Sequence, residues 1–151
     1  MTGEVAVAQR LEQIAGEFND LEPRERLELL LEYAESLPEL PPELQAERDA
    51  GQHRVHECQT PVYIWVRLEG GRVKILADVA PEAPTVKGFV ALLVEAFSGA
   101  KPEEVLALQM NVVQSLGLIE ALGMMRMRGL QAILHYIRAQ IAKARESAPE
   151  S

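Results

Sequence analysis

The chain contains a single cysteine, Cys58, and its surroundings are the first place to look for chemistry. It stands in the segment 55–61 (VHECQTP), just before a run of strand-forming residues. A thiolate is a strong nucleophile, and the junction of a loop with a strand can hold it on a rigid support while leaving it accessible. A free cysteine is also often a small buried apolar residue. The local sequence leaves both interpretations open.

Charged neighbours could tune the reactivity of Cys58 in either direction. His53, Arg54 and His56 can place positive charge near the sulfur, which favours the thiolate. Glu57 opposes ionisation of the thiol if its carboxylate faces the sulfur, but adjacent side chains on an extended chain point to opposite faces.

The same segment offers a second chemistry, metal binding. Ligand atoms are available within a short span from His53, His56, Glu57 and Cys58. The spacing is not specific for a metal site, and one cysteine cannot hold an iron–sulfur cluster alone. A metal-binding scaffold therefore stays an alternative function. A hydrolytic cysteine enzyme needs a base near the thiol, and His135 lies far along the chain in a helical segment, where a surface position is favoured.

A methionine cluster surrounds an arginine further along the chain. Met124, Met125 and Met127 can be adaptable core filler or a contact surface, and the core is favoured. Arg126 can pair with a carboxylate or assist a thiolate.

Composition predicts an ordinary folded domain. The 151 residues are 48% hydrophobic and 25% charged, which indicates one domain over 1–151 with its own core. The 23 acidic and 15 basic side chains give a net charge of -8, which disfavours nucleic acid and anionic membranes as partners. No signal peptide or long apolar stretch is visible, and one cysteine cannot form an intramolecular disulfide, so we expect a cytoplasmic protein.

The N-terminal third predicts helices followed by a loop. Apolar residues recur at helical spacing over 5–18, and a second helix starts near Pro23 and stops at Pro38. Three prolines and many charges over 38–58 predict a loop with a short helical turn at 43–49.

The spacing of apolar residues then changes from a helical to a strand-like pattern, which predicts a β-hairpin. Strand-forming residues fill 62–68, two glycines follow, and apolar residues continue at 73–76. An upstream strand at 54–57 would add a third strand. Thr85 can cap the next helix, which ends near Phe97. The remaining expected elements are a short helix at 102–108, an apolar-periodic segment at 111–122, a last helix at 128–144 and a disordered tail at 145–151. This order of elements predicts an α+β fold with a small antiparallel sheet packed against several helices.

The order of motifs resembles the SufE family of sulfur acceptors over nearly the whole chain. The segment 58–63 (CQTPVY) looks like the family's cysteine–glutamine–serine motif at the start of a strand. Other matching segments occur around it in family order: 24–33 (RERLELLLEY), 37–40 (LPEL), 86–88 (VKG), 116–118 (LGL), and Arg126 with 129–130 (GL).

The resemblance implies a fold, a role and partners. The fold would be the α+β one related to iron–sulfur scaffold proteins. Cys58 would take persulfide sulfur from a pyridoxal-phosphate-dependent cysteine desulfurase, stimulate that enzyme and relay the sulfur to an iron–sulfur scaffold. The expected partner-binding or supporting residues are Gln59, His56, Lys87 and Arg126. The chain itself would need neither a cofactor nor a metal for this transfer.

Some positions depart from the family pattern. Glu57 stands where the family commonly has glycine, and Thr60 replaces a serine. The methionine cluster replaces a proline and serines. A different mode of partner recognition is therefore expected, and a pure interaction module is the second alternative function.

Overall fold

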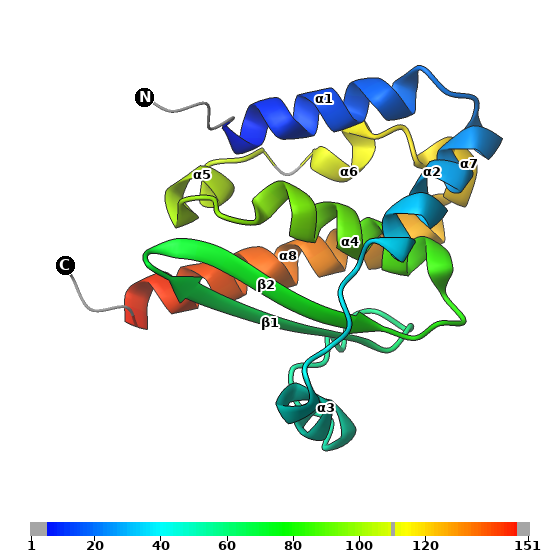
Figure 1. The fold of residues 1–151 in the computed structure, drawn as a ribbon. Helices are drawn as coiled ribbons and strands as arrows, with labels where there is room; N and C mark the ends of the chain where they lie inside the picture. Colours follow the sequence, from blue (N-terminus) through cyan, green and yellow to red (C-terminus); the bar gives the residue numbers. More distant parts are fainter. Residues whose placement is uncertain (1–5, 110, 148–151) are drawn as a thin grey trace.

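The computed structural model describes residues 6–109 and 111–147. Helices come first, a hairpin follows, and helices complete the chain (Figure 1). In chain order the elements are α1 (Val7–Asn19), α2 (Pro23–Glu35), α3 (Pro42–Asp49), β1 (Val62–Glu69), β2 (Arg72–Val79), α4 (Pro84–Phe97), α5 (Pro102–Leu106), α6 (Val112–Ser115), α7 (Ile119–Leu122) and α8 (Met124–Ser147). The predicted α+β class is confirmed.

The hairpin is the only sheet among the described residues. β1 pairs antiparallel with β2, in a register that runs from Val62 opposite Val79 to Glu69 opposite Arg72. Gly70 and Gly71, with φ of 60° and 77°, form the turn, because a two-residue hairpin loop of this kind needs positive φ at both positions.

The two faces of the hairpin pack against different partners. Val62 and Ile64 point into the main core. Figure 1 shows the hairpin alongside α4 and α8. Trp65 points the other way and packs with Leu40 and Leu44, which belong to α3 and the segment before it. This division follows from the alternation of side chains along a strand.

Helix α4 forms the centre of the molecule. Most of its side chains are buried, and it lies between the hairpin on one side and α1 and α6 on the other (Figure 1). Gly88 lets α2 approach closely, since a Cβ atom there would collide with the carbonyl oxygen of Leu30. In the described part of the chain, no helix has the length and apolarity needed to cross a bilayer.

Buried Arg26 ties the corner between α1 and α2 to the region around α7. Its Nε–H donates to the carbonyl oxygens of Phe18 and Leu21, at 2.9 and 3.0 Å. Its Nη1 donates to the carbonyl oxygen of Gly117 at 2.6 Å and to Oε1 of Glu120 at 3.2 Å. One guanidinium thus satisfies three carbonyl groups at the ends of helical segments.

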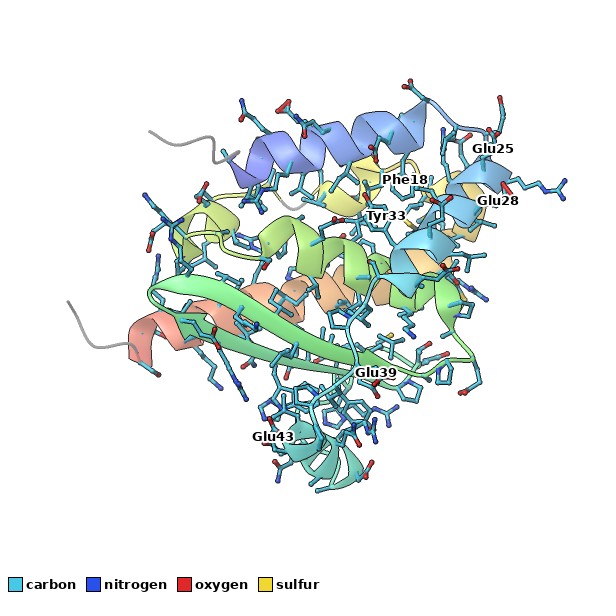
Figure 2. The ribbon with its side chains drawn as sticks, in the orientation of Figure 1. Phe18, Glu25, Glu28, Tyr33, Glu39 and Glu43 are labelled. Carbon is cyan, nitrogen blue, oxygen red and sulfur yellow. The ribbon has the colours of Figure 1, made fainter. Side chains whose placement is uncertain are left out.

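An aromatic pair closes the same corner. The rings of Phe18 and Tyr33 stack with centroids 6.2 Å apart, between α1 and α2 (Figure 2). Burial, with the carboxylates of Glu17 and Glu95 adding to it, raises the pKa of the Tyr33 phenol to about 12. The phenol therefore stays protonated far above its ordinary range.

The third strand expected at 54–57 does not form. Arg54 makes an isolated bridge with Tyr63, and the chain then turns, since the N–H of Cys58 donates to the carbonyl oxygen of Val55 at 3.2 Å. The turn lifts the segment from the edge of β1, so pairing ends after Val55.

Several expected boundaries move in the C-terminal half. The N-cap of α4 is Ala83, and Pro84 rather than Thr85 begins the helix. Helix α8 begins at Met124 and continues to Ser147, so the first residues of the tail expected at 145–151 are helical. Residues 148–151 lie outside the described residues.

The core interpretation of the methionine cluster is wrong for two of its members. Met124 and Met125 are 62% and 79% exposed, whereas Met127 is buried. The first turn of α8 projects past the core, so only Met127 reaches inward.

Candidate functional site

Cys58 is a free thiol buried at the base of its loop. Its exposed fraction is 5%, and it belongs to the main hydrophobic core. The sequence left burial and accessibility of this thiol both open, and in the structure the side chain is buried.

Helix α8 lies directly against the sulfur. A Cβ atom placed on Gly129 would lie 3.7 Å from Sγ of Cys58. Apart from the two chain neighbours of Gly129 and the local helix backbone, no other described atom comes within 4 Å of that position. The missing side chain therefore leaves a space about the size of a methyl group beside the thiol.

Both ends of the cysteine loop, residues 56–60, are fixed by hydrogen bonds to the hairpin. On one side, the N–H of Val55 donates to the carbonyl oxygen of Val62 at 2.8 Å. On the other, the N–H of Ala80 donates to the carbonyl oxygen of Pro61 at 3.2 Å. These two hydrogen bonds fix where the loop begins and ends.

The exposed residues of the loop flank the buried thiol. His56, Glu57 and Gln59 are all exposed. Burial, and to a smaller degree the Glu57 carboxylate, raises the pKa of Tyr136. The Glu57 carboxylate thus lies within electrostatic reach of a phenol two turns along α8 from Gly129.

Arg126 lies one helical turn before Gly129 and lines a surface hollow of about 460 Å³. Its Nη1 donates to Oγ1 of Thr85 at 3.2 Å, and its side chain is exposed. The lining residues are Leu27, Leu31, Thr85, Ala121, Leu122 and Arg126.

Exposed apolar side chains gather around this hollow. Leu31 (41% exposed) lines it, and Ile119 (44%), Met124 and Met125 adjoin its lining residues in α7 and α8. We call the hollow and these exposed side chains the α2–α8 patch. Large exposed apolar residues on a described surface that is otherwise charged are typical of a contact site.

Lys87 lies in a different hollow from Arg126. It is half-buried at the start of α4 and shares a hollow of about 280 Å³ with the segment between α2 and α3. Asp78 lines the same hollow and pairs with Arg48, with Nη1 and Oδ2 3.2 Å apart. Arg126 and Lys87 therefore line different hollows, and only Arg126 belongs to α8, the helix that approaches Cys58.

The ligand set considered for a metal is not gathered. Over residues 6–109 and 111–147, no three side chains of His, Cys, Asp or Glu lie close enough to hold an ion together. His53 instead contacts Glu47 and Trp65.

Sequence reasoning noted Gly129 only as part of a matching segment, and it assigned neither Gly129 nor Tyr136 to the site. A glycine inside a helical pattern is the signal that could have found the first, because it often marks a close approach. Spacing along α8 from Gly129 could then have indicated Tyr136.

The fold and the site define an α+β protein that carries one protected thiol on a loop with fixed ends. A family model described as "SufE: Fe-S metabolism associated domain" matches residues 12–141. The chain belongs to the SufE family, and its domain is one associated with Fe–S metabolism.

Similar proteins cover nearly the whole chain. An uncharacterized SufE-like protein of Mycobacterium tuberculosis is 29% identical over 145 residues, or 95% of this chain and 99% of the relative. An uncharacterized SufE-like protein of Synechocystis is 30% identical over 119 residues, or 79% of this chain and 71% of the relative. The solution structure of a hypothetical protein from Thermus thermophilus is 39% identical, with a TM-score of 0.79, and covers 95% of this chain and 100% of that one.

Proposed function

We propose that this protein is a sulfur acceptor that takes persulfide sulfur from a cysteine desulfurase onto Cys58. The observation that carries the proposal is the position of Cys58, which is buried against Gly129 on a loop whose two ends are held by the hairpin. Membership of a family associated with Fe–S metabolism supports the same role.

The transfer is a thiol–disulfide type of exchange. The Cys58 thiolate attacks the outer sulfur of the donor persulfide, and a new S–S bond forms on Cys58. The donor's own S–S bond breaks, and the donor cysteine leaves as a thiolate. No net oxidation occurs, so the step requires no cofactor on this chain.

The space beside Gly129 gives the persulfide a place to rest. A persulfide adds one sulfur atom to Cys58, and the methyl-sized space lies within contact distance of Sγ. Burial among apolar side chains keeps reductants away from the outer sulfur, while movement of the loop returns it to the surface.

The α2–α8 patch is our proposed docking surface for the desulfurase. Arg126 is the one charged residue among those that line its hollow, and Gly129, one turn further along α8, contacts the cysteine. A partner segment that presents an apolar side chain next to a carboxylate fits this combination. A desulfurase that docks here would lie next to the loop that carries Cys58, whose thiolate attacks the donor persulfide.

Other residues of the site would act during the encounter. Exposed His56 and Gln59 flank Cys58 and would contact the donor once the loop moves out. Lys87, in its separate hollow, would extend the contact area. The loaded protein would then pass the sulfur to an iron–sulfur scaffold in the cytoplasm and so stimulate turnover of the desulfurase.

Intact mass measurement tests this proposal. The protein is incubated with a cysteine desulfurase, its cofactor and cysteine, and is then weighed without reductant. We expect a gain of one sulfur mass that reductant removes and that Cys58→Ala does not acquire. A wild-type mass that stays unchanged while the desulfurase itself becomes loaded would refute the acceptor role. Full cellular function of Cys58→Ala would support an interaction module instead.

A further inference from the structure

His53 has an unusual backbone conformation just before the cysteine loop. Its φ is 64°, and among the described residues it is the only non-glycine residue with a positive φ. A non-glycine residue with positive φ has a strained backbone, which persists where surrounding contacts compensate for the strain. The compensating contacts therefore indicate what holds the segment.

The backbone of His53 is paired with the hairpin. Its carbonyl oxygen accepts a hydrogen bond from the N–H of Ile64 at 3.0 Å, and the bridge between Arg54 and Tyr63 follows. His53 is thus the first residue of the short segment that fixes the cysteine loop to β1.

The side chain of His53 joins a compact group on the outer face of the hairpin. Its ring stacks on Trp65 with centroids 5.1 Å apart and planes inclined by 27°. Nε2 lies 3.3 Å from Oε1 of Glu47 in α3, an ion pair when the imidazole is protonated. The Nε1–H of Trp65 donates to the same Glu47 oxygen at 3.0 Å.

This group is separate from the main core. Trp65 packs in the smaller cluster with Leu40 and Leu44, whereas Cys58 belongs to the large one on the inner face. A small cluster that holds one short helix opens at a lower free energy than a core of packed helices. Opening of α3 would release His53 without unfolding the rest of the protein.

We propose that His53, Trp65 and Glu47 form a clamp that holds the start of the cysteine loop and thereby keeps Cys58 buried against α8. When α3 and the clamp are in place, pairing with β1 fixes the backbone up to Val55, and the turn from Val55 buries the thiol. When the clamp opens, the loop gains length and Cys58 reaches the surface. The role of the clamp in the cell rests on the proposed sulfur transfer. The test of the clamp does not, because it uses the isolated protein.

The test measures how fast iodoacetamide alkylates Cys58 in the isolated protein, followed by intact mass. His53→Asn removes the ring but suits the left-handed backbone, since asparagine tolerates positive φ. We expect alkylation about tenfold faster, the effect of losing an aromatic pair and a polar contact. Trp65→Phe keeps a stacking ring but loses the bond to Glu47, so a smaller acceleration is expected.

His135→Asn is the matched control, because it makes the same chemical change at an exposed site on α8. It should alkylate at the wild-type rate. Trp65 is the only tryptophan in the chain, so its emission reports the clamp directly and should move to longer wavelength in His53→Asn.

Two results would overturn the clamp. One is alkylation of His53→Asn within twofold of the wild-type rate. The other is an acceleration that matches the loss of global stability in denaturant unfolding, because Cys58 would then be reached only through complete unfolding. Neither outcome bears on whether Cys58 accepts sulfur, which the mass experiment decides separately.

Discussion

Sγ of Cys58 lies 3.7 Å from the point that a Cβ atom on Gly129 would occupy. This distance is an ordinary van der Waals contact, so an alanine fits beside the thiol but removes the adjoining space. A Gly129→Ala substitution should therefore raise the stability of the fold and shorten the lifetime of a persulfide on Cys58.

Gly129→Ala should stabilise the protein and weaken its capacity to hold a persulfide. Alanine favours a helix interior by about 0.5–1 kcal/mol over glycine, and we expect a gain of up to that size in denaturant unfolding. The persulfide on Cys58 should be reduced several-fold faster by glutathione, because its outer sulfur no longer fits beside α8.

Gly16→Ala provides the matched control for this change. Gly16 lies in α1, and a Cβ atom there would meet no atom within 4 Å. This variant should show a similar gain in stability and an unchanged persulfide lifetime. Equal persulfide lifetimes in all three proteins would contradict the storage role of the space.

Arg126→Ala should weaken docking of the desulfurase without exposing the thiol. Loss of a charge-assisted contact at an interface predicts a dissociation constant about tenfold higher, which fluorescence anisotropy or calorimetry would measure. Alkylation of Cys58 in the isolated protein should stay at the wild-type rate, because the side chain of Arg126 donates its hydrogen bond to Thr85 in α4.

Arg128→Ala separates this effect from a general loss of positive charge. Arg128 is exposed on the same helix and does not line the hollow. A loss of affinity equal to that of Arg126→Ala would show that net charge, rather than the α2–α8 patch, governs binding.

Arg26→Met should destabilise the fold strongly. It removes the N–H groups that donate to the carbonyl oxygens of Phe18, Leu21 and Gly117. These buried carbonyls would be left unpaired, which predicts a cost of about 3 kcal/mol in denaturant unfolding.

Glu120→Gln is the control for Arg26→Met. It removes only an ion pair whose carboxylate is 66% exposed, so a change of about 0.5 kcal/mol or less is expected. Similar losses in both variants would assign the effect to the ion pair.

Tyr33 should make stability fall with rising pH in the alkaline range. The folded-state pKa of about 12 exceeds the ordinary value near 10, so the folded protein binds more protons between these values. The stabilising contribution is complete below about pH 10 and is lost as the pH rises through about 12. Its size should be roughly 1 kcal/mol, since solvent screens a partly buried phenol.

The measurement compares urea unfolding of the wild type and Tyr33→Phe from pH 9 to about pH 11.5. The difference between their unfolding free energies should shift steadily against the wild type as the pH rises. A difference that is constant over this range would contradict the raised pKa.

The sequence predicts elements whose signals are local. Two adjacent glycines between alternating apolar residues indicate the hairpin, and helical periodicity places α1 and α4 to within a few residues. Cys58 stands out for the same reason, since a single cysteine beside a recognisable motif needs no tertiary information.

Contacts between distant segments could not be predicted in this way. Gly129 approaches Cys58, and Arg26 reaches Gly117, only because several helices pack in one arrangement. The exposure of Met124 and Met125 has a similar origin. Their apolarity suggests burial, but the first turn of α8 extends beyond the core that covers the rest of the helix.

The bond from Arg26 to Gly117 joins residues 91 positions apart and has a consequence for synthesis. On a ribosome, α1 and α2 emerge long before the carbonyl group that their buried guanidinium requires. The N-terminal helices therefore cannot bury the Arg26 guanidinium, which stays hydrated, until most of the chain has left the exit tunnel. The domain should acquire resistance to proteases in one late step, after residue 117 and α8 have emerged, rather than helix by helix.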